Sequence, residues 1–152
     1  MPIDLHEKLS PHFTLSELVH TSHRYIDNNP TPEIVEQLRT LCRDFLEPVR
    51  TIFGPLRINS GYRCPELNTA IGGSKTSAHM HGCAADFVPL HDYTTNQIVK
   101  WIADSGLPFD QVIDEYSSTS NWVHMGIVPP VRDPRRQVLT MRRGKYSLFD
   151  GS

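Results

Sequence analysis

The sequence contains no long apolar run, and its start lacks the features of a targeting segment. No stretch approaches the roughly 18 consecutive apolar residues that a transmembrane helix needs. The opening residues, MPIDLHEKLS, have neither the basic start nor the apolar stretch of a signal peptide. We therefore expect a soluble protein that is cytoplasmic as synthesised and that has no membrane partner.

Cysteine is scarce, and charge of neither sign is in large excess. The three cysteines, Cys42, Cys64 and Cys83, lack the close pairing of a cysteine-based zinc site, so we expect buried free thiols. The formal net charge is −2, which gives no overall positive field to attract nucleic acid. Six basic residues gather in VRDPRRQVLTMRRGK, residues 131–145, but we expect no nucleic-acid partner.

The remaining composition is that of an ordinary globular domain. Of 152 residues, 38% are hydrophobic and 21% are charged, which does not fit a disordered chain. No internal repeat, low-complexity tract or long linker divides the sequence. A chain of this length can bury roughly 70% of its unfolded surface. We therefore expect one domain over residues 1–152.

Residues typical of helix N-termini predict where the helices begin. Thr14 lies three residues before Glu17, as in a capping box, and predicts a short helix from about 15 to 20. Thr31 and Pro32 begin the main amphipathic helix, within residues 31–54, and Pro48 should bend it. Two further helices are expected within residues 64–73 and 94–106.

Strands are expected mainly in the second half of the chain. Short β-branched segments predict them at residues 56–60, 84–89, 110–116, 121–128 and 136–141. Helices that come first and strands that cluster late favour an α+β domain with an antiparallel sheet.

The stretch TSAHMHGCAADF, residues 76–87, holds a candidate metal site. His79 and Asp86 are too far apart for neighbouring turns of one helix. They can meet if His79 ends a loop, Asp86 lies in the following strand, and Gly82 lets the backbone curl between them. A catalytic zinc takes a third protein ligand, and His124 is the leading candidate.

Alternation in NWVHMGI places His124 on one face of its strand with Trp122 and Gly126. The apolar Val123, Met125 and Ile127 occupy the other face, which should meet the core. From spacing alone, the alternatives are that His124 is a hydrogen-bonded core residue and that Asp86 caps a neighbouring group.

A longer stretch, INSGYRCPELNTAIGGSKTSAHMHGCAADF, resembles the zinc D-alanyl-D-alanine carboxypeptidase family of peptidoglycan peptidases, especially its small bacteriophage and prophage members. The segments FTLSEL, LEPVRTIFG and FDQVIDEY...NWVHMGI are similar to other parts of that family, so the resemblance covers about residues 12–145. The positions that fill the family pattern are Ser60, Gly61, Tyr62, Arg63, Ser77, His79, Gly82, Ala84 and Asp86.

This resemblance implies a fold and a site. The fold would have N-terminal helices packed on an antiparallel sheet, as in lysostaphin-type peptidases and the hedgehog signalling domain. The sheet would carry one zinc ion, held by His79, Asp86 and His124. The substrate would be a peptidoglycan stem peptide, oriented by Arg63 and contacted by the hydroxyl of Ser77.

The general base is where the sequence departs from several members of the family. These place an acid three residues before the last histidine, but Asn121 stands there, and an amide is no base. Other small members have an acid on the preceding strand, and Glu115 fills that place. Alternation puts Glu115 and Asp114 on opposite faces, so we choose Glu115 as the base with Asp114 as the fallback. His81 fits no ligand position and is expected at the rim.

Two functions follow from this resemblance. The first is hydrolysis of stem peptides by zinc-activated water, as a D,D-carboxypeptidase or an endolysin-like endopeptidase, in a protein we expect to be a monomer. The second is a virion or tail module of a phage that keeps the zinc fold with little activity, a reading that Asn121 favours. In either case the protein would reach the cell wall after release or as part of a phage particle.

Overall fold

A six-stranded sheet organises the computed structural model, which describes residues 3–128 and 132–151. Val131, the first residue of the basic segment, lies outside these ranges. The strand order is β3-β4-β6-β5-β7-β8, and a separate pair, β1 (Lys8–Ser10) and β2 (Phe13–Thr14), precedes the sheet in the chain. The strands of the sheet are β3 (Leu56–Ser60), β4 (Ala84–Pro89), β5 (Gln111–Tyr116), β6 (Asn121–Gly126), β7 (Gln137–Arg142) and β8 (Lys145–Leu148).

The expected α+β class is confirmed, and the sheet is antiparallel except at one pair. Strands β5 and β7 run parallel, with Ile113 opposite Leu139. A parallel neighbour cannot be reached by a tight hairpin. The chain therefore crosses from β6 past β5 before it enters β7, and it then turns back into β8, a strand that the sequence did not predict.

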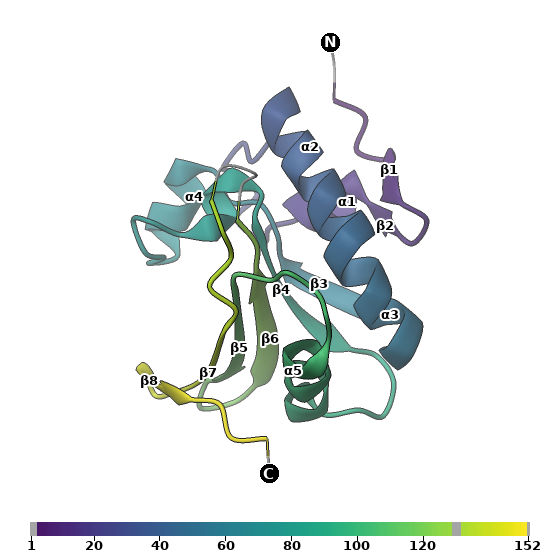
Figure 1. Ribbon diagram of the computed structural model, residues 1–152. Coiled ribbons are helices and arrows are strands. Elements are labelled where there is room, and N and C mark those ends of the chain that lie inside the picture. The colour runs from purple at the N-terminus through teal and green to yellow at the C-terminus, as the bar shows by residue number, and fades with distance from the viewer. Residues whose placement is uncertain (1–2, 129–131, 152) are drawn as a thin grey trace.

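Helices lie on both sides of the sheet (Figure 1). On one side lie α1 (Leu15–Val19), α2 (Pro32–Leu41), α3 (Glu47–Phe53) and α5 (Thr95–Asp104), and on the other lies α4 (Pro65–Ala70). The caps expected at Thr14 and Thr31 are present, and Thr94 caps α5: each threonine accepts a hydrogen bond from a backbone N–H of the helix that it precedes. These caps explain why N-terminal capping residues in the sequence predict where the helices begin.

The main helix is interrupted just before Pro48. A π-helical segment, η1 (Cys42–Leu46), joins α2 to α3, and Pro48 lies in the first turn of α3. Proline has no N–H to donate, and its ring crowds the carbonyl four residues earlier. The wider π-helical turn lies just before Pro48, where the sequence predicts a bend in the helix.

The core fills the space between the sheet and the helices of the first side. Phe87 of β4 and Val123 and Met125 of β6 are fully buried there, together with Leu46 and Ile98. The apolar face of β6 is therefore the one that alternation predicts. All three cysteines are free, with Cys42 and Cys83 buried and Cys64 half-buried.

Among the described residues, no helix combines the length and the apolar character needed to span a bilayer.

Candidate metal centre and its cleft

Three side chains from separate elements converge on the face of the sheet that is turned away from the core. His79 lies in the 3-10 turn η2 (Ala78–His81), Asp86 in β4 and His124 in β6. Asp86 and His124 are directly opposite each other in the β4–β6 pairing. Asp86 Oδ1 lies 2.9 Å from His124 Nδ1 and 3.3 Å from His79 Nε2. The structure thus brings the three predicted ligands together.

The backbone turn between His79 and Asp86 depends on a glycine and on a cap. Ser77 precedes η2, and its hydroxyl accepts a hydrogen bond from the N–H of His79 at 3.2 Å. Gly82 ends η2 with φ at 71°, in the left-handed region that glycine adopts without strain. The chain then enters β4 two residues before Asp86. Ser77, predicted on the substrate side, lines the cleft and also holds the turn that carries a ligand.

The carbonyl of Gly61 fixes the imidazole of His79. His79 Nδ1 lies 2.7 Å from this oxygen, so the Nδ1–H donates there and Nε2 is the ring nitrogen that faces Asp86. A Cβ at position 61 would lie 2.3 Å from the carbonyl oxygen of Leu18, so no larger residue fits without moving backbone. The motif Ser-Gly-Tyr-Arg therefore supplies a backbone acceptor, which side-chain reasoning did not find.

The backbone around Gly61 is tied in turn to the N-terminal part of the chain. The N–H of Tyr62 donates to the carbonyl of Leu18 at 2.7 Å. Buried Asn28 donates from Nδ2 to the carbonyls of Val19 and Tyr62, at 3.0 and 2.9 Å. The loop that orients His79 is thus held by the end of α1 and by the segment that follows it.

Arg63 contacts a candidate ligand directly. Its Nη2 donates to Asp86 Oδ2 at 3.1 Å, and its Nε donates to the hydroxyl of Ser60 at 2.9 Å. Because Oδ1 faces the histidines while Oδ2 faces Arg63, the carboxylate is held from both sides. Arg63 also lines the cleft, on the side expected for a substrate contact.

Burial and mutual contacts shift the pKa of all three groups. Burial lowers the pKa of His79 despite the nearby Asp86, which favours the neutral form of the imidazole that can bind a metal. Burial opposes charge on Asp86, but His79 and His124 outweigh it and hold the pKa of Asp86 well below its usual range. For His124 burial lowers the pKa, yet the hydrogen bond and charge of Asp86 dominate and raise it.

The donor set fits zinc. Two imidazole nitrogens and one carboxylate oxygen are a common set for a catalytic zinc that keeps one position open. Tetrahedral zinc holds its ligand atoms about 2.1 Å away, and therefore roughly 3.4 Å from one another. The ligand atoms of His79, Asp86 and His124 all lie within 4.8 Å of each other. A small adjustment of side chains would bring them to this geometry.

Glu115 faces the same cleft, whereas Asp114 does not. Glu115 pairs with Trp122 across β5 and β6 and is half-buried in the cleft lining. Burial and the charge of Asp86 raise the pKa of Glu115. Asp114 is 1% exposed on the other face, where it accepts hydrogen bonds from Thr95 at 2.7 Å and Tyr116 at 2.9 Å. The fallback base is therefore tied to α5 and β5.

Asn121 and His81 are both peripheral to the three ligands. Asn121 is exposed at the start of β6, and its amide donates to Thr95 Oγ1 at 2.7 Å, beside Asp114. His81 is exposed and lines the edge of the cleft. This position agrees with the prediction, and the backbone at His81 belongs to the 3-10 turn η2.

The cleft around the site has a volume of about 980 Å³ and extends well beyond the ligands. One side comes from the residues between α4 and η2. The opposite side comes from the C-terminal part of the chain, which the sequence did not place near the site. The cleft residues supplied by that part include Arg132, Arg135, Met141 and Tyr146.

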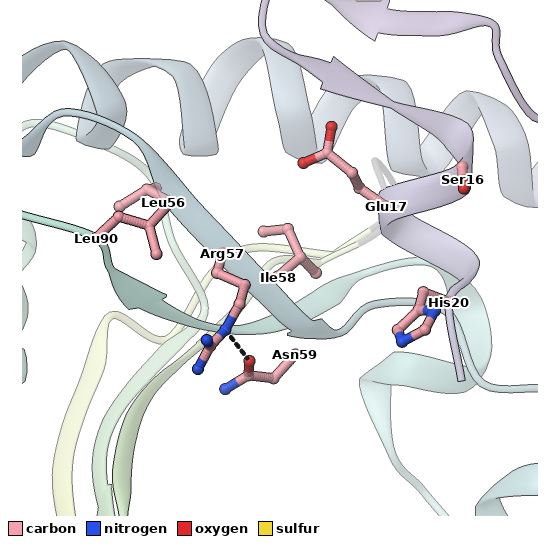
Figure 2. A pocket seen from close by; sticks show the side chains of 8 residues that line it. All are labelled: Ser16, Glu17, His20, Leu56, Arg57, Ile58, Asn59 and Leu90. Carbon is pink, nitrogen blue, oxygen red and sulfur yellow. Dashed lines mark hydrogen bonds between the residues drawn. The ribbon is translucent and has the colours of Figure 1, made fainter. Parts of the chain in front are cut away.

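A second hollow of about 630 Å³ lies between α1 and the edge strand β3. Figure 2 shows His20 and Glu17 on one side of it and Arg57 and Asn59 on the other, with Arg57 bonded to Asn59. Among the described residues the candidate metal cluster is confined to the first cleft. We therefore assign the functional site there.

Comparison with known families agrees with this geometry. A family model described as Peptidase M15 matches residues 11–126, which include all three candidate ligands, Arg63 and Glu115. The match ends before the basic C-terminal segment. Comparison with curated proteins gives no match. Because the family match covers well over half of the sequence, the chain belongs to the M15 peptidase family, the family of the zinc D-alanyl-D-alanine carboxypeptidases.

Proposed function

We propose that the protein is a zinc peptidase that hydrolyses peptide bonds in the stem peptides of bacterial peptidoglycan. The main support is the arrangement of a His-Asp-His donor set and a half-buried glutamate in one cleft of an M15 family chain. In this proposal His79, Asp86 and His124 hold one zinc ion. When bound, zinc lowers the pKa of water and polarises the scissile carbonyl.

Glu115 acts as the general base in this proposal. A carboxylate accepts the proton of the attacking water and returns it to the leaving amine, and such transfer is most effective when its pKa is near the working pH. The raised pKa of Glu115 moves in this direction. Asp114 cannot substitute, because it lies on the opposite face and is bonded to Thr95 and Tyr116.

Arg63 has a role in holding Asp86 and a second role toward the substrate. Its contact with Asp86 Oδ2 supports the first role, because it keeps the carboxylate oriented and ionised. A planar guanidinium also suits the terminal carboxylate of a peptide. Nε and one N–H of Nη2 are bonded to protein oxygens, so the donors left for a substrate carboxylate are those of Nη1 and the second N–H of Nη2. Ser77 contributes its hydroxyl at the same side of the cleft.

The test uses purified zinc-loaded protein and isolated peptidoglycan, with and without a chelator. We expect release of muropeptides that stops on metal removal and returns when zinc is added back. If the protein binds stoichiometric zinc and releases nothing, the enzymatic proposal fails, and a virion or tail module with the zinc fold takes its place.

The same experiment with a defined muropeptide separates the two kinds of peptidase. Loss of one terminal residue, measured by mass, identifies a D,D-carboxypeptidase. Appearance of two shorter peptides identifies an endopeptidase.

A further inference from the structure

We propose that Arg132 forms a subsite that binds a carboxylate on the substrate, about three residues from the bond that is cut. This inference rests on the proposed function. It is carried by residues at the end of the cleft, part of which lies outside the family match of residues 11–126.

The first step is the position of this group. Arg132, Arg135 and Asp110 all line the cleft. Asp110 comes just before β5, three residues before Ile113, which pairs directly with His124. At about 3.3 Å per residue of strand, Asp110 is roughly 10 Å from the metal ligands. An extended peptide covers that distance with about three residues.

The second step is the charge balance. Asp110 is 6% exposed and accepts three hydrogen bonds from Arg135, from its N–H at 3.0 Å, Nε at 3.1 Å and Nη2 at 2.8 Å. Arg132 Nη2 lies farther from the same carboxylate, at 3.7 Å from Oδ2. Two guanidinium groups thus share one carboxylate, and Arg135 satisfies it. One positive charge is left in excess among these three side chains.

The third step is access. The side chain of Arg132 is 54% exposed and faces the cleft, so it keeps donors for a ligand while Asp110 limits its range of positions. Arg135 is a positioning residue, because its Nε and Nη2 both donate hydrogen bonds to Asp110. Arg136, which follows Arg135, points elsewhere and donates to carbonyls at the end of α5. A carboxylate is the group that Arg132 suits best.

Two other ionisable groups of the cleft, Arg63 and Glu115, lie at other places along it. Arg63 is bonded to Asp86 at the other end of the row of ligands. Glu115 is two residues from Ile113 in the opposite direction from Asp110 along β5. The cleft therefore has the proposed base, Glu115, at one place and the proposed cationic subsite at another, an arrangement that suits a peptide with an acidic residue near the cleaved bond.

The test compares synthetic stem peptides that differ only in one group. In one pair a carboxylate or its carboxamide lies three residues before the cleaved bond, and in a second pair three residues after it. We expect the zinc-loaded protein to prefer the acid in one pair by roughly tenfold in kcat/KM, as for one charge-assisted contact. The preference should shrink as salt concentration rises.

Variants then show whether Arg132 causes the preference for the acid peptide. Arg132→Gln should abolish it, and Arg132→Lys should retain part of it. Arg57→Gln is the matched control, because Arg57 is an exposed arginine beside the second hollow, and it should leave the preference unchanged. Equal kcat/KM for acid and amide in both pairs overturns the inference while leaving the proposed function intact. So does a preference that survives in Arg132→Gln.

A binding measurement keeps the inference testable if no peptide is cut. In the zinc-loaded Glu115→Gln background, calorimetry should show about tenfold tighter binding of the acid peptide, and Arg132→Gln should remove this difference. Equal binding of both peptides, or no binding of either, overturns the subsite. Failure of the proposed function alone appears as tighter binding of the acid peptide without hydrolysis by the wild-type protein.

Discussion

Asp114 and Glu115 are neighbours in β5, yet they lie on opposite faces of the sheet. Asp114 is buried under α5 and holds two hydroxyl groups, those of Thr95 and Tyr116. Glu115 is half-buried in the cleft, where burial and then the charge of Asp86 raise its pKa. The same functional group therefore joins secondary-structure elements on one face and is available for proton transfer on the other. The alternation of the strand decides which carboxylate faces the cleft and which faces α5.

The largest effect should come from removing a candidate metal ligand on the cleft face of the sheet. His124→Ala removes one of three donors, and we expect loss of stoichiometric zinc and at least roughly a 10³-fold loss of kcat/KM. Metal content after dialysis and peptidoglycan hydrolysis measure the two effects. His81→Ala is the matched control, because His81 is an exposed histidine at the edge of the same cleft. Equal zinc loss in both variants would remove His124 from the ligand set.

The next effect separates the two neighbouring acids. Glu115→Gln should lower kcat by about 10²- to 10⁴-fold and leave zinc bound, because it removes only the base. Asp114→Asn should leave kcat within about threefold and cost about 1–3 kcal/mol of stability, because a buried acceptor loses part of its hydrogen bonding. Kinetics and thermal unfolding of the two variants check this. If Asp114→Asn shows the larger loss of kcat, the assignment of the base is wrong.

A smaller effect concerns the carboxylate at the far end of the cleft. Burial opposes charge on Asp110, but the hydrogen bonds and charge of Arg135 outweigh it, so the pKa of Asp110 is lowered from 3.8. A lowered pKa in the folded state stabilises the protein above the unfolded pKa, and this stability is lost as pH falls through the folded pKa.

Compared with Asp110→Asn, the wild-type protein should therefore be more stable at pH 7. Arg135 is about half exposed, so solvent screening limits the difference to about 1 kcal/mol. The difference should shrink as pH falls below about 4. Thermal unfolding of both proteins across this range measures it, and a difference that grows toward low pH would contradict the ion pair.

The smallest effect should come from Asn121→Asp. This change restores the acid that several family members have three residues before the last histidine. Because Asn121 is bonded to Thr95 on the α5 side, we expect kcat to change by less than about twofold. The double variant Asn121→Asp, Glu115→Gln sharpens the result. A recovery of activity in the double variant would mean that an acid at position 121 reaches the reacting groups.

Local patterns predicted those features that depend on neighbours in sequence. The capping box at Thr14 fixes a helix start, and period-two alternation in β5 and β6 separates Glu115 from Asp114 and His124 from Val123. Each of these follows from the geometry of a single helix or strand. The fold class and the family resemblance were confirmed as well.

Contacts between distant segments could not be read from the same patterns. The bond between Arg63 and Asp86 joins residues 23 positions apart, and it depends on β3 pairing with β4. The parallel approach of β7 to β5 brings Met141 and Tyr146 to the cleft. Periodicity tells which face a side chain occupies, but not which strand lies next to it.

The contact between Gly61 and Leu18 has a practical consequence for shortened forms of the protein. Removal of α1 and of the segment up to Asn28 would release the loop whose carbonyl orients His79. A fragment that begins at α2 would keep all three candidate ligands, and we expect it to bind zinc poorly. We therefore expect the proposed metal site to need α1, although this helix contributes no candidate ligand.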